Sequence, residues 1–366
     1  MVRASLRSAI AALITGLALL HPAAAQPWAP GLEPPPAPTA TPAAAQALET
    51  LRRSGSGPDL RRRYLEAAHT LLQRYWAPRV PPRLLLAGDG AQGCGVREVR
   101  EPMAYYCPQS NEIAMAIDLR RSVRSARGRS DRELLLLDLA VLAHEWGHLV
   151  NREQGRGPYS GGFELTVRQE ELAADWRTGV FLGWLLTHGV LGVDDFTQTA
   201  NLLFEMGDYE RIMPQHHGYP MDRFEALTRG LATQVAVGQR LGEWTVDSRE
   251  AFSRPLVRAA APGADPARRV YEVRRFEIDS SNQVATNLLG GLLGAASCLW
   301  GSQQQCLGMA MEQGKGRTEG TYTNRTLSLD CASGSFDVSE DDHGPQPLGR
   351  DGKGQAAVLV GRDCGR

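Results

Sequence analysis

The stretch HEWGH, residues 144–148, places two histidines and one glutamate where a single metal ion and a water molecule could use all three. Histidines four residues apart in a helix are separated by about 40° around the axis and by one turn along it, so both can face one metal. Glu145 follows His144 at about 100°, which puts its carboxylate within reach of a metal-bound water. The stretch therefore predicts a helix with zinc-peptidase geometry and Glu145 as general base.

The residues around this motif predict a buried helix from 130 to 153. Ser130 and Glu133 form a capping-box pattern, which marks a helix start. The run LLLLDLAVLA, residues 134–143, is apolar on nearly every side of a helix. Gly147 would let this helix approach a neighbour closely, and Trp146 is expected to pack in the core.

A polar patch on a surface helix is the alternative interpretation of the motif. It fits poorly with the apolar run before the motif. Two histidines and a glutamate inside a buried helix each need a partner to offset the loss of water, and a metal ion provides one.

A zinc site of this kind needs a third protein ligand and an open fourth position. The best candidate is Glu171, which follows a glycine-rich loop at 152–162 and lies in a strongly helical segment, QEELAAD, residues 169–175. Asp175 lies one turn further on the same face, where it could accept the second ring N–H of a ligating histidine. Glu170 is the main competitor as ligand, but it points about 100° away and is expected to face solvent.

Several blocks of the sequence together resemble a known family. They are GCG at 93–95 with YYCP at 105–108 and a strand-like stretch after it, HEWGH at 144–148, EELAAD at 170–175 and HGYPMDR at 217–223. In order and spacing they look like the bacterial neutral zinc metallopeptidases, a gluzincin-type group. In that group HExGH is followed by an ELQADC-like block and then by HG with an arginine several residues on. The resemblance covers about residues 60 to 240 and is more specific than HEWGH alone.

The resemblance implies a role for each matching residue. It makes zinc ligands of His144 and His148, a catalytic base of Glu145, a third ligand of Glu171 and its helper of Asp175.

Two positions depart from the family pattern, and one block remains open. Ala173 replaces the usual glutamine and Trp176 the usual cysteine, and neither is an inferred ligand. In the HG block, His217 could stabilise the oxyanion of the transition state and Arg223 could hold a carboxylate by a bidentate pair. The alternative is that both residues brace a turn between helices.

The N-terminus has the pattern of a secretory signal peptide, residues 1–25. Arg3 and Arg7 precede an apolar stretch at 9–20, and AAA at 23–25 offers a cleavage site. The apolar stretch is too short to span a membrane, and no cysteine follows it directly to carry a lipid. We therefore expect a secreted or periplasmic protein with no integral membrane span after signal cleavage.

Six cysteines in an exported chain suggest disulfides. Sequence proximity favours Cys94 with Cys107, Cys298 with Cys306, and Cys331 with Cys364. Only the first pair is also supported by the family pattern. A cysteine-ligated metal is the competing interpretation, but the chain contains no CxxC pair.

The patterns divide the chain into a Pro- and Ala-rich linker at 26–46, a catalytic domain at 47–242 and an accessory C-terminal region at 243–366. Helical periodicity covers 60–76, 130–153, 164–188, 194–212 and 221–241, and strand-like stretches cover 83–86, 103–107 and 112–117. These predict an α+β fold: a zincin-like domain with a small antiparallel sheet beside a helical bundle, followed by a small disulfide-containing region. Residues 284–300 are apolar enough for a buried helix and short for a membrane span.

The strand at 112–117 precedes the metal helix and could be a sheet edge that receives an extended peptide. The alternative is an ordinary strand whose edge is covered. Nucleic acid is not an expected partner, because Lys and Arg number 40 and Asp and Glu 41, which leaves no broad basic surface.

Together these observations predict an exported zinc-dependent metalloendopeptidase with one zinc ion per chain and a protein or peptide substrate. Zinc would polarise the scissile carbonyl and lower the pKa of its water toward about 7, while Glu145 takes the proton and delivers it to the leaving amine. Two other classes stay open: a catalytically silent, zinc-stabilised binding or chaperone-like protein, and a zinc amidase that acts on cell-wall material.

Overall fold

The computed structural model describes only part of the chain. The described residues are 34–35, 41–53, 59–99, 104–116, 129–156, 167–205, 219–236, 238–246, 256–259, 268–279, 319–332, 335–338 and 346–347. Five expectations therefore lie outside the described residues: the signal peptide, the apolar stretch 284–300, the position of His217, and the pairings of Cys298 with Cys306 and of Cys331 with Cys364.

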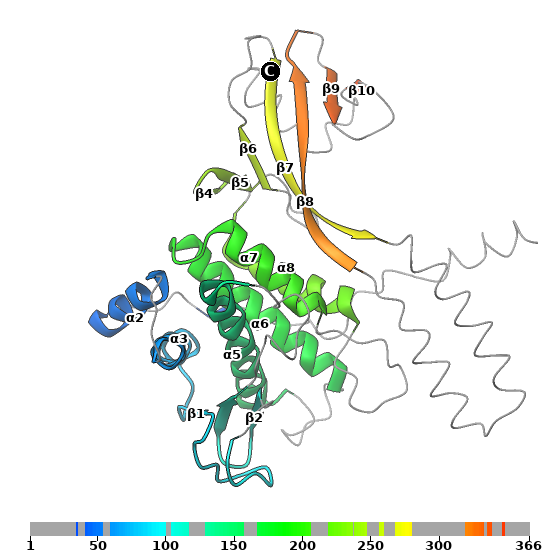
Figure 1. Ribbon diagram of the computed structural model, residues 1–366. Helices are drawn as coiled ribbons and strands as arrows, with labels where there is room; N and C mark the ends of the chain where they lie inside the picture. The colour runs from blue at the N-terminus through cyan, green and yellow to red at the C-terminus, as the bar shows by residue number, and fades with distance from the viewer. Residues whose placement is uncertain are drawn as a thin grey trace, which may run out of the picture. The chain divides into compact units, whose positions relative to one another are not determined.

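The described elements form a mixed α+β structure, as the sequence predicts (Figure 1). The helices are α2 (Pro42–Arg52), α3 (Leu60–Trp76), α5 (Asp131–Glu153), α6 (Val167–Thr187), α7 (Val193–Glu205) and α8 (Pro220–Gln234). The first sheet contains β1 (Arg83–Leu86), β2 (Ala104–Cys107) and β3 (Glu112–Met115). The second contains β4 (Arg240–Leu241), β5 (Trp244–Val246), β6 (Leu256–Ala259), β7 (Arg268–Asp279), β8 (Glu319–Asp330), β9 (Ser335–Val338) and β10 (Gln346–Pro347).

Two boundaries differ from the sequence prediction. Helix α2 begins at Pro42, so residues 42–46, which were assigned to the linker, are helical. Its start is capped by Thr41, whose hydroxyl accepts a hydrogen bond from the Ala44 N–H at 3.2 Å. Helix α8 ends at Gln234 rather than near 241, because the chain then turns into the short strand β4.

Helix α5 starts and packs as its sequence predicts. Ser130 and Glu133 form a complete capping box, in which each side chain accepts a hydrogen bond from the other residue's backbone N–H. Nearly every residue from Leu135 to Val150 is buried, including the motif residue Trp146. The helix is therefore surrounded by protein along its middle, and polar groups on it must find partners there.

Glycines let the three central helices approach one another closely. A Cβ added at Gly147 of α5 would lie 2.7 Å from the Ala174 Cα of α6, as the expectation for Gly147 requires. Between α6 and α8, an added Cβ would strike the backbone carbonyl of Leu227 at Gly179 and that of Trp176 at Gly230. The two helix crossings are thus backbone-to-backbone contacts.

The first sheet corrects two expectations. It is mixed rather than antiparallel, because β1 pairs with β3 in parallel while β2 pairs with β3 antiparallel. The strand order is β1-β3-β2. Strand β3, the predicted edge for a peptide, is thus the central strand, and its backbone hydrogen bonds are used on both sides. All four of its residues are buried, which agrees with that central position.

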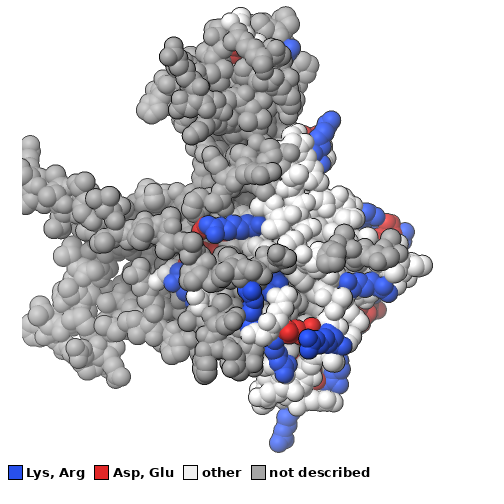
Figure 2. Space-filling view, turned by 180° about the vertical axis from the view of Figure 1, so that it is seen from behind, with Lys and Arg blue, Asp and Glu red and all other residues white. Residues whose placement is uncertain are grey.

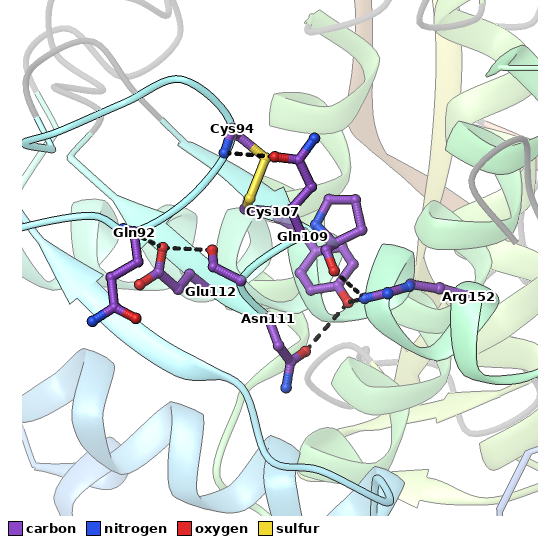
Figure 3. The surroundings of a disulfide bond; sticks show 10 residues. Gln92, Cys94, Cys107, Gln109, Asn111, Glu112 and Arg152 are labelled. Atoms are coloured by element: carbon purple, nitrogen blue, oxygen red, sulfur yellow. Dashed lines mark hydrogen bonds between the residues drawn. A yellow bond between two sulfur atoms is a disulfide. The ribbon is translucent and has the colours of Figure 1, made fainter.

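The predicted disulfide between Cys94 and Cys107 is present and ties the loop after β1 to the end of β2 (Figure 3). Beneath it, the buried carboxylate of Glu112 accepts hydrogen bonds from the Gln92 N–H at 3.0 Å and the Ser110 hydroxyl at 2.7 Å. Arg83 also pairs with Glu112. These partners lower the pKa of Glu112 even though burial alone would raise it.

The disulfide-bonded loop is joined to helix α5 by Arg152, which lies near the end of that helix (Figure 3). Its guanidinium donates to the Tyr106 hydroxyl at 2.9 Å and to the Pro108 carbonyl. The sheet and the helix that carries HEWGH are therefore linked by polar contacts.

The C-terminal region contains more sheet than expected. Seven strands run antiparallel in the order β10-β9-β8-β7-β6-β5-β4, and β7 pairs with β8 along its full length. Tyr271 and Val273 on β7 and Leu327 and Leu329 on β8 are buried, each at alternate positions. That alternation is the mark of a sheet with one covered face. Cys331, just after β8, is disulfide-bonded, as expected for a disulfide-containing region.

Within the described part of the chain, no helix is long and apolar enough to cross a membrane.

Charged side chains are mixed on the face shown in Figure 2, where blue basic groups are separated by uncharged surface or lie beside red acidic ones. Surface pairs such as Arg53 with Glu49 at 2.9 Å contribute little stability each.

Candidate metal centre

Helices α5 and α6 bring together two imidazoles and a carboxylate. The Nε2 atoms of His144 and His148 lie 3.1 Å apart. Glu171 Oε2 lies 3.1 Å from His144 Nε2, and Glu171 Oε1 lies 3.6 Å from His148 Nε2. One ligand atom from each residue falls within a set whose members are all within 4.8 Å of one another. This buried group could hold a metal ion.

The local sequence explains this convergence. His144 and His148 are one helical turn apart, so their rings share a face, with centroids 4.7 Å apart and planes at 90°. Glu171 lies in the first turns of α6, which runs beside α5 where Gly147 meets Ala174. At this point only the Ala174 methyl group and backbone lie between the two helix axes. The helices are therefore close enough for the Glu171 carboxylate to reach the two rings.

Asp175 holds the ring of His144 from its far side. The His144 Nδ1–H donates to Asp175 Oδ1 at 2.8 Å, so the Nε2 atom is the one that faces His148 and Glu171. Asp175 is fully buried, as an outer carboxylate partner of a ligand requires. Both sequence expectations for Asp175, its position and its histidine partner, agree with this placement.

Arg223 does bind a carboxylate by two hydrogen bonds, and that carboxylate belongs to Asp175. The Arg223 Nε donates to Oδ2 at 2.7 Å and Nη2 to Oδ1 at 2.9 Å. The arginine comes from α8 and is itself buried. A guanidinium engaged in this way stabilises the charge of Asp175 within the protein.

Glu170 differs from its sequence prediction. It was expected to face solvent, yet only 6% of it is exposed. The reason is that α6 is buried on all sides from Glu170 to Leu186. The side of the helix that Glu170 faces, about 100° from that of Glu171, is therefore also covered by protein. Its Oε1 lies 3.5 Å from the Nδ1 of His148. Glu170 therefore belongs to the site.

Glu145 is adjacent to His144 and close to the group of His144, His148 and Glu171. It is buried but keeps 8% of its surface exposed. Its charge acts on both His148 and Arg223, which places the carboxylate at the same centre. Among the described residues, none forms a hydrogen bond or ion pair with its carboxylate.

The electrostatics of the centre favour a cation between the rings. Burial alone would lower the pKa of His144, but Asp175 and then Glu171 raise it to about 10. The pKa of His148 is also raised, because Glu171 and Glu170 outweigh burial. The pKa of Asp175 stays low because Arg223 and His144 outweigh burial. Carboxylates that favour the protonated form of each imidazole would also favour a metal ion in place of those protons.

Trp146, the central residue of the motif, is anchored on the opposite side of α5. Its indole N–H donates to His69 Nδ1 at 3.2 Å, and the other nitrogen of His69 lies 3.2 Å from the Pro82 carbonyl. His69 comes from α3, and burial lowers its pKa to about 4. The imidazole is thus neutral and donates to Pro82. Sequence reasoning missed this contact, because nothing local links His69 to the motif.

A second buried contact joins the end of α5 to the first half of α6. Arg177 Nε donates to Asn151 Oδ1 at 2.8 Å and Nη2 to Gln154 Oε1 at 2.6 Å. Asn151 in turn donates from Nδ2 to the Glu170 carbonyl at 3.2 Å. This network fixes the backbone at Glu170. No sequence pattern indicates it, since its members are neutral amides and one arginine.

Comparisons with protein-family models, with curated proteins and with solved structures found no match. The site therefore stands on its own geometry. His217 lies outside the described residues, and its predicted catalytic role is not addressed by the structure.

Proposed function

We propose that the protein is an exported zinc metalloendopeptidase. The observation that carries the proposal is the buried set of His144, His148 and Glu171, with Glu145 next to it on the same helix. Two imidazoles and one carboxylate are a ligand set of catalytic zinc sites, in which the fourth position stays open. The resemblance of the HEWGH and EELAAD blocks to neutral zinc metallopeptidases supports the same activity.

The donor set fits zinc better than a hard cation. Calcium and magnesium prefer sites made entirely of oxygen ligands, whereas two of the three donors here are imidazole nitrogens. The carboxylate on His144 Nδ1 is also the partner that metal-bound histidines commonly have. We assign one zinc ion per chain to this site.

When bound, zinc would supply Lewis-acid polarisation of a substrate carbonyl and lower the pKa of a water molecule toward about 7. Glu145 takes the proton of that water and transfers it to the leaving amine. Asp175 keeps His144 in the tautomer whose Nε2 can ligate, and Arg223 keeps Asp175 charged. Burial of all these groups excludes bulk water, which strengthens their interactions.

The fold supports assignment to the zincin-like class. The helix that carries the motif packs beside a small sheet, and a following helix contributes the third ligand. Export is supported by the N-terminal signal pattern and by the Cys94–Cys107 disulfide, since disulfides persist in oxidising compartments.

The direct test compares the wild-type chain with Glu145→Gln. We expect one zinc per chain in both proteins, and cleavage of a mixed peptide library by the wild type only, read by mass spectrometry. Glu153→Gln, the same substitution near the end of α5, is the matched control and should cleave normally. Cleavage by Glu145→Gln at the wild-type rate would remove Glu145 as general base.

The same assay separates the other functional classes. Stoichiometric zinc without cleavage of any peptide would indicate a zinc-stabilised binding protein. Release of products from cell-wall material, but not from peptides of ordinary sequence, would indicate a zinc amidase. A wild-type chain that binds no zinc would overturn the metal assignment itself.

A further inference from the structure

The two ligand histidines are held in parallel ways. Each Nε2 faces the other ring and Glu171, and each Nδ1 faces a second carboxylate of helix α6. For His144 that carboxylate is Asp175, and for His148 it is Glu170. We propose, on the basis of the proposed zinc site, that Glu170 is a positioning residue which orients His148 for metal binding.

Glu170 is placed for this role and not for ligation. Its Oε1 lies 3.5 Å from the Nδ1 of His148, on the side of the ring away from Glu171. Glu171, the residue beside it, is the one that reaches the Nε2 atoms of both rings. Consecutive glutamates on one helix point about 100° apart, so one can reach the metal face of a ring while its neighbour reaches the other.

The backbone at Glu170 is fixed from the other side. Asn151 is fully buried and donates to the Glu170 carbonyl, while its own side-chain oxygen accepts from Arg177. Since Asn151 lies on α5 less than one turn beyond His148, the same helix carries both the ligand and the group that positions its partner. The backbone that carries the Glu170 carboxylate is therefore fixed in position.

The two carboxylates differ in strength of contact. Asp175 lies 2.8 Å from its imidazole, whereas Glu170 lies 3.5 Å from the other, which is longer than a good hydrogen bond. Asp175 also shares its charge with Arg223. Glu170 should thus contribute less than Asp175 to metal affinity, but in the same direction.

The test is zinc affinity, measured on the full chain by competition with a chromophoric chelator, with zinc alone as the probe. Loss of an outer partner of a ligand typically weakens metal binding about 10- to 100-fold. We expect Glu170→Ala to raise the zinc Kd about tenfold and Asp175→Ala to raise it further. Glu170→Gln, which keeps an acceptor oxygen, should recover part of the loss.

Glu225→Gln is the matched control, because Glu225 is another buried glutamate of the bundle and pairs with Arg229 on its own helix. Its zinc Kd should equal that of the wild type. The visible spectrum of the cobalt-substituted protein gives a second readout, which should shift in Glu170→Ala and stay unchanged in Glu225→Gln. A merely structural role for Glu170 would not alter the ligand field.

The outcomes separate this inference from the proposed function. If the wild type binds zinc and loses it on His148→Ala, while Glu170→Ala keeps both the wild-type Kd and the cobalt spectrum, the role of Glu170 is overturned and the metal site stands. If the wild type binds no zinc, both fail. Should Glu170→Ala not fold, Glu170→Met takes its place, because it also removes the acceptor oxygen while filling the space; an unchanged Kd and spectrum in that variant would equally overturn the role.

Discussion

Helix α5 adjoins two regions of different charge, each with one histidine. The charged region faces α6 and contains His144. The neutral region faces α3 and consists of Trp146 and His69; the ion pair of Arg61 and Asp138 joins the same two helices further along. Toward α6, His144 lies between Asp175 and Glu171, which raise its pKa to about 10. Toward α3, His69 accepts from Trp146, and its pKa falls to about 4. Burial lowers the pKa of both imidazoles, so the carboxylates account for the difference. Of these two histidines, His144 is held as a cation by the acids around it, and His69, which has none, stays neutral.

The largest expected effect comes from Arg223→Met, which breaks the charged region. It leaves the fully buried Asp175 without its guanidinium, and removing one member of a buried ion pair costs about 3–5 kcal/mol. The free energy of unfolding from urea titration measures this loss, which should be accompanied by weaker zinc binding. Arg62→Met is the control, because its pair with Glu66 is exposed and should contribute less than about 1 kcal/mol. Equal losses in the two variants would contradict the comparison.

Acidification should act on the neutral region. The pKa of His69 is lowered from 6.5 to about 4 by folding, so the folded protein binds this proton less readily than the unfolded chain. The contribution of neutral His69 to the free energy of unfolding is therefore fully present above pH 6.5. It is lost as the pH falls toward 4, and the loss is about 3 kcal/mol.

Urea unfolding of the metal-free protein between pH 4 and 7 measures this loss. His69→Gln should flatten the dependence in that window. In the same window His144 remains protonated in the folded protein and adds no loss, because its pKa is raised. A slope that His69→Gln leaves unchanged would refute the neutral state of His69.

Zinc affinity should rise with pH, because zinc competes with the protons that the charged region holds. In the metal-free protein His144 holds a proton below about pH 10, and zinc must displace it. Affinity should therefore rise about tenfold per pH unit between pH 7 and 9 for each proton released. Chelator competition at several pH values measures the slope, and His69→Gln should retain it. An affinity independent of pH would show that His144 is not protonated.

The smallest expected effect is that of Trp146→Phe. It removes the indole N–H that His69 accepts, at a cost of about 1 kcal/mol, and should leave zinc affinity unchanged because Trp146 faces away from the ligands. Thermal unfolding measures the change. Tyr75→Phe is the matched control, since the buried Tyr75 hydroxyl has no hydrogen-bond partner in the described structure. A loss of zinc binding in Trp146→Phe would mean that the two regions are coupled.

Sequence reasoning succeeded where the deciding signal is local. The capping box of Ser130 and the apolar run predicted the start and burial of α5, and the spacing of His144, His148, Glu171 and Asp175 predicted residues that the structure brings together. Helix periodicity converts such spacings directly into shared faces.

It failed where distant parts of the chain decide. The solvent-facing prediction for Glu170 assumed that α6 has an exposed side, but the helix is buried all around. The central position of β3 depends on pairing with strands before it in sequence, which its own residues do not specify. Strand β7 does carry a local signal, since apolar Tyr271 and Val273 alternate with charged residues.

The glycine contacts also bear on which cations the centre accepts. At Gly147, Gly179 and Gly230 no side chain separates the helices, so α5, α6 and α8 cannot move closer together or adjust by a change of rotamer. The radius available between the ligands is then set by backbone contact. Zinc binds nitrogen and oxygen at about 2.0–2.2 Å and calcium binds oxygen at about 2.3–2.6 Å. The close packing of these three helices should therefore make the centre select ions by size, in addition to the selection made by its nitrogen and oxygen ligand atoms.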